Sequence, residues 1–257
     1  MRIRMVVEYD GSDFIGYQLQ SSGTRTVQGE LETAVGLLNR RPTRVYGSGR
    51  TDKGVHAIGQ VVHCDVHWRY TPSAALKALN AVLPRDVAVR SVDVVDATFD
   101  SQRNATSRTY RYVVDNGALR RPLLRLHAWH VPKKLDVTAM STAANVFIGV
   151  QDFRSFGTVL QGKSTLRRLD RLDVTRSGDS VVIDVTANAF LRQMVRALVG
   201  TLVEVGLGRI GLADVREILA VKDKGACPPV APPQGLYLMH VDYSGVRIDV
   251  RNKEMTI

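Results

Sequence analysis

Apolar and polar residues alternate at the start of the chain and then change to a helical spacing. Between residues 2 and 9 every second side chain is apolar, which predicts a β-strand. Between residues 27 and 38 apolar side chains recur every three or four positions, which predicts an amphipathic helix with Thr26 as its N-cap. Further elements are expected as a short strand near Val45, a strand over 60–67, a helix starting at Thr71 and a strand over 87–95. The predicted order is β-α-β-β-α-β.

A second series of elements follows Ser107. It comprises a strand over 108–114, a helix capped by Asp136, a hairpin of 166–175 and 181–187, an apolar helix from 189 to about 205 capped by Asn188, a helix over 212–221 and a strand over 236–243. Two such series predict an α+β protein of two tandem ferredoxin-like, or RRM-like, βαββαβ halves with antiparallel sheets. The halves are placed at residues 1–106 and 107–257, and the polar residues 247–257 are expected to form a loose tail.

The charge of the chain is strongly positive. It has 35 lysines and arginines against 25 acidic residues, a net charge of +10. A central basic cleft between the halves would suit a polyanion, although a generally basic proteome would give the same balance. Cys64 and Cys227 lie far apart and do not indicate a disulfide framework. No leader-like segment or membrane-length apolar run occurs, so we expect a cytoplasmic protein without a membrane partner.

A glycine-rich loop over residues 47–57 is the first candidate for chemistry. Three glycines fall within eight residues, and a single carboxylate, Asp52, lies between two cations, Arg50 and Lys53. Most loops of this composition are simple turns. A polar loop that leads into a rigid strand is, however, a common place for functional side chains. The pattern alone leaves both interpretations open.

Arg196 lies in a segment that is apolar on nearly every side. A helix of this kind is buried, so its guanidinium either needs a carboxylate partner or reaches the surface along its methylenes. Asp52 and Asp184 are the two candidate partners.

Tyr110 and Tyr112 share one face of a predicted strand. A tyrosine ring can stack on any nucleobase, and it can equally fill a core. Arginines at 103, 108 and 111 surround the pair and favour an RNA-facing role for one of the two tyrosines.

Several other kinds of site are excluded or disfavoured. His63, Asp65 and His67 share a strand face, but without a supporting metal motif an exposed or loosely packed polar face is expected instead. Cys64 is assigned to the core. The chain has no phosphate-binding Gly-x-x-x-x-Gly-Lys motif, no nucleophile elbow around Ser48, and in the glycine-rich loop no second carboxylate of the kind that a glycosidase needs.

Six motifs together resemble those of the tRNA pseudouridine synthase A family, in the family order. They are EYDGSDFIGYQ at 8–18, GRTDKGVHA at 49–57, GQVVH at 59–63, RTYRY at 108–112, NAFLRQMVR at 188–196 and GLYL at 235–238. The similarity covers nearly the whole chain, from the first strand to Tyr243. It departs from the usual pattern at Tyr17, at Lys53 and at residues 101–103, where an arginine contact is either lost or supplied by Arg103.

The resemblance implies a tandem ferredoxin-like fold, a homodimer, and a basic cleft for the anticodon stem-loop of tRNA. The implied activity is conversion of uridine to pseudouridine at positions 38, 39 and 40, without a cofactor or a metal. Asp52 corresponds to the catalytic aspartate, Tyr110 to the tyrosine that packs on the target base, and Arg196 to the partner of the aspartate. Arg50 is expected to help hold the place of the flipped-out nucleotide.

Two alternatives stay open at this point. One is a non-catalytic RNA-binding or tRNA-folding protein that uses the same cleft. The other is a phosphohydrolase with a carboxylate nucleophile, which would require a metal.

Overall fold

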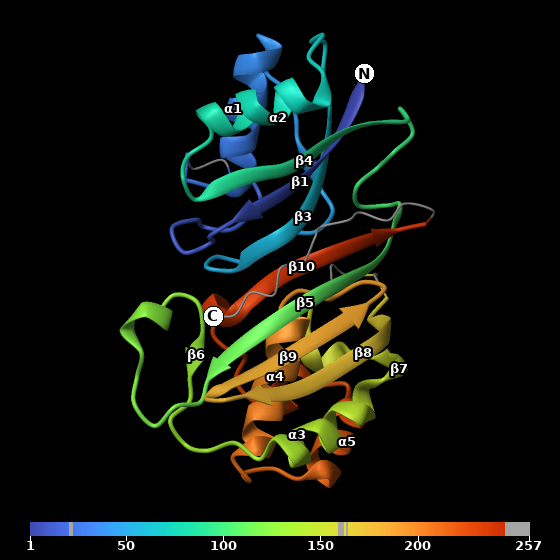
Figure 1. Ribbon diagram of the computed structural model, residues 1–257. Coiled ribbons are helices and arrows are strands. Elements are labelled where there is room, and N and C mark those ends of the chain that lie inside the picture. The colour runs from blue at the N-terminus through green and yellow to red at the C-terminus, as the bar shows by residue number, and fades with distance from the viewer. Residues whose placement is uncertain (21–22, 159–161, 163, 245–257) are drawn as a thin grey trace.

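The computed structural model describes residues 1–20, 23–158, 162 and 164–244, and the expected tail at 247–257 lies outside this part of the chain. The described residues form a mixed α+β fold with a ten-stranded sheet and five α-helices. Figure 1 shows the sheet running through the whole molecule, with α1 and α2 packed on its N-terminal part and α3, α4 and α5 on its C-terminal part. None of the described helices is long and apolar enough to cross a membrane.

The strands occupy two successive stretches of the chain. The first stretch contains β1 (Arg2–Tyr9), β2 (Tyr46–Gly47), β3 (His56–Asp65) and β4 (Val87–Val95). The second contains β5 (Ala105–Asp115), β6 (Trp129–His130), β7 (Gly149–Asp152), β8 (Leu166–Ser177), β9 (Ser180–Ala187) and β10 (Leu236–Tyr243). The helices are α1 (Val27–Asn39), α2 (Pro72–Val82), α3 (Val137–Ala144), α4 (Met194–Gly206) and α5 (Leu212–Val221).

Strand order is β4-β1-β3-β10-β5-β9-β8-β7, with β2 paired to β3 and β6 paired to β5. Neighbours within each stretch are antiparallel along this path. The two stretches meet where β3 and β10 pair in parallel, with Tyr237 opposite His56 and Leu238 opposite Ala57. The two expected sheets are therefore joined edge to edge into one, and β3 and β10 lie side by side in the middle of Figure 1.

Local sequence signals predicted many boundaries correctly. The strands at 2–9, 87–95 and 236–243 and the helix at 212–221 have the predicted bounds. Thr26 and Thr71 cap their helices as expected, since their side chains accept hydrogen bonds from the amides of Gly29 and Ala74.

Among the boundaries that differ from the prediction, two lie next to the residues of interest. The apolar helix starts at Met194 instead of Ala189, because Gln193 adopts a left-handed conformation with φ of 65°. Asn188 does not cap it; its side chain accepts a hydrogen bond from the amide of Arg168. The strand predicted at 60–67 begins earlier, at His56, since pairing with β10 extends it.

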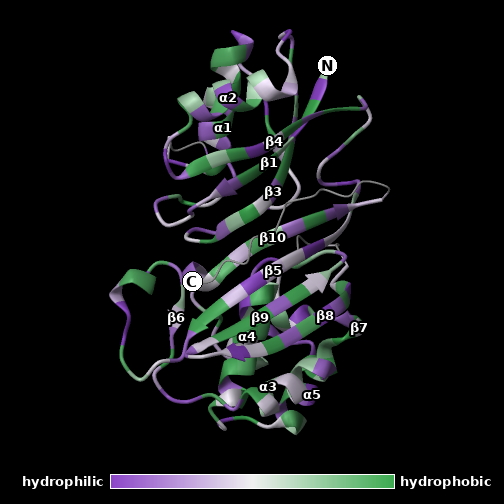
Figure 2. Ribbon diagram, in the orientation of Figure 1, coloured by the Kyte–Doolittle hydropathy of each residue, from purple (hydrophilic) through white to green (hydrophobic). Residues whose placement is uncertain are grey.

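Helix α4 is the centre of the C-terminal core. Of its thirteen residues, only Arg196 and Glu204 are not buried. Figure 2 shows it as a largely hydrophobic helix against the sheet. Gly200 permits this packing, because a Cβ there would lie 2.2 Å from the carbonyl oxygen of Pro229. The predicted burial of this helix is confirmed, and it leaves Arg196 as a cation at the edge of an apolar core.

Candidate active site

The loop between β2 and β3 carries Asp52, and its first residues are held by β3. The buried amide of Gln60 donates to the carbonyl oxygen of Gly49 at 2.8 Å and accepts from the hydroxyl of Ser48 at 2.8 Å. The amide of Ser48 also donates to the carbonyl of Val61 at 2.8 Å. These bonds fix the entry of the loop against a central strand.

The middle of the loop is held from β1 and the turn that follows it. The hydroxyls of Tyr9 and Thr51 lie 2.8 Å apart, and the amide of Tyr17 donates to the carbonyl of Thr51 at 3.0 Å. Gly16 allows this approach, since its φ is +119° and a Cβ would lie 2.9 Å from the Thr51 oxygen. The residue before Asp52 is thus anchored on both its side chain and its backbone.

Asp52 and Arg196 are brought together by the fold. Nη1 of Arg196 donates to Oδ2 of Asp52 at 3.2 Å, and the two side chains are 13% and 32% exposed. Nε of Arg196 donates to the carbonyl of Ala231 at 2.7 Å, so the proline-rich segment 227–233, between α5 and β10, orients the guanidinium. The other candidate partner, Asp184, instead binds Arg111 with both oxygens.

Tyr110 and Tyr112 both lie on β5 but have different surroundings. Tyr110 is 8% exposed and packs edge-on against Phe190, with ring centroids 5.2 Å apart. Its hydroxyl points towards the loop, because a Cβ at Gly49 would lie 3.9 Å from that oxygen. Tyr112 is fully buried and donates to the carbonyl of Pro232 at 2.7 Å. Only Tyr110 therefore reaches the loop.

The hydroxyl of Tyr110 is a weak acid in this environment. Burial raises the pKa of Tyr110 to about 12, and the nearby Asp52 carboxylate raises it further while Arg108 opposes the change. The hydroxyl is therefore protonated at neutral pH and can donate a hydrogen bond.

The cations around Asp52 differ in how they are used. Arg50 and Lys53 are exposed, and no hydrogen bond or ion pair joins them to another described residue. Arg103 is 88% exposed, with only a 3.9 Å contact to Asp100. Arg108, one of the three arginines around the tyrosine pair, is half-buried and binds backbone carbonyls.

The polar face predicted at His63 and Asp65 is only partly exposed. His63 is 4% exposed, lies 2.9 Å from the hydroxyl of Ser101 and stacks on Tyr46 at 5.1 Å. Burial lowers the pKa of His63. The expectation of a loose polar face was wrong for His63, because residues far along the chain cover it, whereas Asp65 does lie at the surface, paired with Arg2.

A second titratable cluster, missed from the sequence, consists of Asp10, His56 and His127. Their potential ligand atoms lie within 4.8 Å of one another. The amide of Gly11, however, donates to Nδ1 of His56 at 3.0 Å, while Nε2 lies 2.9 Å from the carbonyl of Leu126 and 3.1 Å from that of Gln234. Both ring nitrogens are therefore occupied, and the cluster fits a structural hydrogen-bonded junction better than a metal site. The sequence offered one signal, the histidine next to the end of the 49–57 motif.

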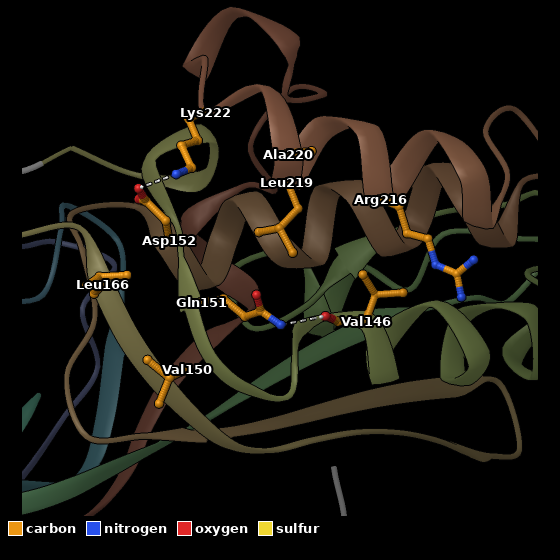
Figure 3. Close-up of a pocket in the computed structure, with 9 residues that line it drawn as sticks. All are labelled: Val146, Val150, Gln151, Asp152, Leu166, Arg216, Leu219, Ala220 and Lys222. Carbon is orange, nitrogen blue, oxygen red and sulfur yellow. Dashed lines mark hydrogen bonds and ion pairs between the residues drawn. The ribbon is translucent and has the colours of Figure 1, made fainter.

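A separate hollow of about 460 Å³ lies between β7 and α5. Figure 3 shows Lys222 reaching Asp152 across one end of it, at 3.5 Å, while Leu219 points towards the strand. Its lining includes none of the four candidate residues Asp52, Arg50, Tyr110 and Arg196.

Comparison with known proteins agrees with the motifs. The family model described as tRNA pseudouridine synthase matches residues 5–102 and 143–244, which include the loop, β3, α4, β10 and the larger part of β1. The chain is 47% identical over 244 residues to tRNA pseudouridine synthase A of Afipia carboxidovorans, covering 94% of this chain and 99% of the relative. It is 46% identical to the protein of the same name from a Bradyrhizobium species, again over 94% and 99%.

A third protein of that name, from a Shewanella species, is 43% identical over 95% of this chain and 93% of its own length. A chain of a solved Cbf5-Nop10-Gar1 complex is similar only at a TM-score of 0.35 and 12% identity, over 78% of this chain and 45% of that one, which is too weak to bear on the fold. Both the family model and the full-length relatives lead to one conclusion: the chain belongs to the tRNA pseudouridine synthase family.

Proposed function

We propose that this protein isomerises uridine to pseudouridine in tRNA, the activity that the names of its relatives give for those proteins. The observation that carries the proposal is the contact of Asp52 with Arg196, which joins two segments 144 positions apart inside the matched region. The reaction breaks the N1–C1′ bond, turns the uracil and joins C5 to C1′, after which C5 loses its proton and N1 takes one up.

Asp52 is proposed as the catalytic carboxylate. The isomerisation needs a group that attacks the ribose or the base, or that takes the C2′ proton, and a carboxylate can do each of these. Arg196 binds Oδ2, whereas Oδ1 has no hydrogen bond to any described residue. One oxygen is therefore held in place and the other is open to the substrate.

Tyr110 is proposed to contact the target base. A uridine stacked in an RNA stem cannot reach a carboxylate, so it must flip out, at a cost of about a few kcal/mol. The ring of Tyr110, held edge-on by Phe190, offers an apolar surface beside the loop for the displaced uracil. Because its pKa is about 12, the hydroxyl serves as a hydrogen-bond donor and is a poor base for the C5 proton in the free protein.

Arg50 and Lys53 are proposed to contact the RNA. Both are exposed cations next to Asp52 without a partner among the described residues, and Arg50 can occupy the gap that the flipped nucleotide leaves. The net charge of +10 supports a polyanionic substrate.

The finer assignments are proposals of the same kind. We propose positions 38, 39 and 40 of the anticodon stem-loop as targets, a homodimer as the assembly and the cytoplasm as the compartment. We also propose that residues 1–106 and 107–257 are tandem ferredoxin-like halves. The strand orders β4-β1-β3-β2 and β10-β5-β9-β8 support this, since each reads fourth, first, third, second when the short strands β6 and β7 are left out of the count.

The test is Asp52→Asn with tRNA carrying tritium at uracil C5. Tritium release by the variant should fall by at least about 10³-fold, because the amide cannot act as a nucleophile or base. The dissociation constant for tRNA should stay within about threefold, which is under about 1 kcal/mol. Asp184→Asn is the matched control, since Asp184 is also paired with an arginine but lies away from the loop.

Three outcomes separate the possibilities. If the unsubstituted protein binds tRNA but releases no tritium, it is an RNA-binding or RNA-folding protein and the enzyme proposal fails. If Asp52→Asn keeps full activity, the catalytic assignment fails. Full activity in EDTA excludes the phosphohydrolase, which would require a metal.

A further inference from the structure

The guanidinium of Arg108 binds only backbone carbonyl oxygens. Nη1 donates to Asn188 at 2.9 Å and Ala105 at 3.3 Å, and Nη2 donates to Ser48 at 3.1 Å and Gln102 at 2.9 Å. No carboxylate of the described residues lies within ion-pair distance of Arg108. Burial lowers the pKa of Arg108, so the four carbonyl dipoles take the place of a counterion.

Other arginines near Arg108 do not behave in this way. Arg111, three residues along β5, binds both oxygens of Asp184 at 2.8 and 2.9 Å. Arg196 has the carboxylate of Asp52. Burying part of an arginine side chain without an acidic partner costs solvation free energy. The guanidinium can make four backbone contacts because it is planar and carries several N–H groups.

Two of the four carbonyls come from segments that belong to the candidate active site. Ser48 opens the loop that leads to Asp52. Asn188 opens the non-helical segment that leads to α4 and Arg196. The contact between Asp52 and Arg196 is itself a single hydrogen bond of 3.2 Å, which leaves their mutual orientation loosely defined. Arg108 supplies a second connection between the same two segments.

We propose that Arg108 is a positioning residue of the isomerisation: it holds the Asp52 loop and the approach to α4 at the separation that the chemistry needs. This inference rests on the proposed function. Misplacing a catalytic group by about 1 Å can cost on the order of 100-fold in rate, so a residue that touches neither base nor ribose can still control the chemical step.

An RNA-phosphate contact is the competing role for Arg108. Four of the five N–H groups of an arginine are already engaged here, which leaves Nε as the remaining donor. A phosphate contact would act on tRNA binding, whereas a positioning role acts on the rate with bound tRNA. A positioning role therefore predicts a change in the single-turnover rate, whereas a phosphate contact predicts a change in the dissociation constant of tRNA.

The experiment compares Arg108→Lys and Arg108→Met with Arg111→Lys, using single-turnover tritium release at saturating tRNA and the dissociation constant of tRNA. A lysine keeps the charge but cannot bridge all the carbonyls. We expect both Arg108 variants to lose on the order of 10- to 100-fold in single-turnover rate, with the dissociation constant within about threefold. Arg111→Lys should stay within about twofold in both.

The result is corrected for the folded fraction, measured by circular dichroism. If Arg108→Met does not fold, Arg108→Lys alone decides. A single-turnover rate within about twofold of the unsubstituted protein overturns the inference, as does a weaker dissociation constant with an unchanged rate. So does a loss that the unfolded fraction fully accounts for. A failure of the proposed function is seen separately, as inactivity of the unsubstituted protein.

Discussion

Two groups of titratable side chains flank the start of β3, and they are built in opposite ways. The Asp10, His56 and His127 cluster surrounds a histidine whose ring nitrogens are both hydrogen-bonded and whose ring stacks on Tyr237 at 4.8 Å. The backbone of the Asp52 loop is held by hydrogen bonds, but only some of the polar groups of its side chains have hydrogen-bond partners. Asp52 makes one side-chain hydrogen bond, and Arg50 makes none with the described residues.

This difference indicates which of the two groups is able to bind and act on a ligand. A polar group whose hydrogen bonds are all made inside the protein stabilises the fold and has nothing left for a substrate. A rigid backbone that presents unused acceptors and donors is preorganised for binding and catalysis. By this criterion we propose that the loop acts on the substrate and that the histidine cluster supports it, since the amide of Val55 bonds to the carbonyl of Asp52 immediately before His56.

Of the substitutions that test this comparison, Arg196→Met is expected to have the largest effect. It removes the hydrogen bond to Oδ2 and the bond to Ala231, so both the orientation and the charge partner of the carboxylate are lost. Single-turnover tritium release should fall by about 10²- to 10³-fold. Arg111→Met, which breaks the pair with Asp184 on β5, serves as the control and should keep its rate within about threefold. Equal losses in both variants would show that the two arginines share a merely structural role.

His56→Ala should have the opposite signature. The histidine is 2% exposed, and its loss leaves the Gly11 amide and two backbone carbonyls without a partner. The free energy of unfolding should fall by about 2–4 kcal/mol, measured by urea denaturation. His127→Ala, on a side chain that is 36% exposed, should cost under about 1 kcal/mol. If His56→Ala loses activity but keeps its full stability, His56 takes part in the reaction, and the comparison between the two groups is reversed.

The sequence was informative where local physics decides the structure. Alternation defined β1 and β4, threonine caps defined the starts of α1 and α2, and an apolar surround predicted the burial of α4. The same argument, that a guanidinium on such a helix needs a carboxylate, proposed Asp52 as one of two partners for Arg196.

Long-range contacts account for what the sequence could not predict. His56 joins β3 because β10, near the other end of the described chain, pairs with it. His63 is buried because Tyr46 and Ser101 cover it. Arg108 was predicted only to lie near the tyrosine pair, and its four backbone carbonyl partners come from separate segments of the chain. Periodicity and motif spacing contain no information on such long-range contacts.

The smallest expected effect is the pH dependence of the free energy of unfolding. It should come from the buried histidines together, and His56 should account for only part of it. Burial lowers the pKa of His56 below its ordinary 6.5, so the folded protein binds fewer protons than the unfolded chain below that pH. The stabilising contribution is complete above pH 6.5 and is lost as the pH falls from 6.5 through the lower folded value. Each such histidine contributes a slope of at most about 1.4 kcal/mol per pH unit in that window.

Urea unfolding at pH 7.5, 6.5 and 5.5 measures this slope. The unsubstituted protein should lose stability between pH 6.5 and 5.5, and His56→Ala should lose less over the same interval, because only His63 among the buried histidines then remains with a lowered pKa. A slope that His56→Ala leaves unchanged would mean that folding does not lower the pKa of His56, and a steeper loss in that variant would mean that His56 is protonated in the folded state, paired with Asp10 at 3.1 Å. Its Nδ1 would then donate instead of accepting from Gly11, and the cluster would hold a charge in the way that the Asp52 loop does.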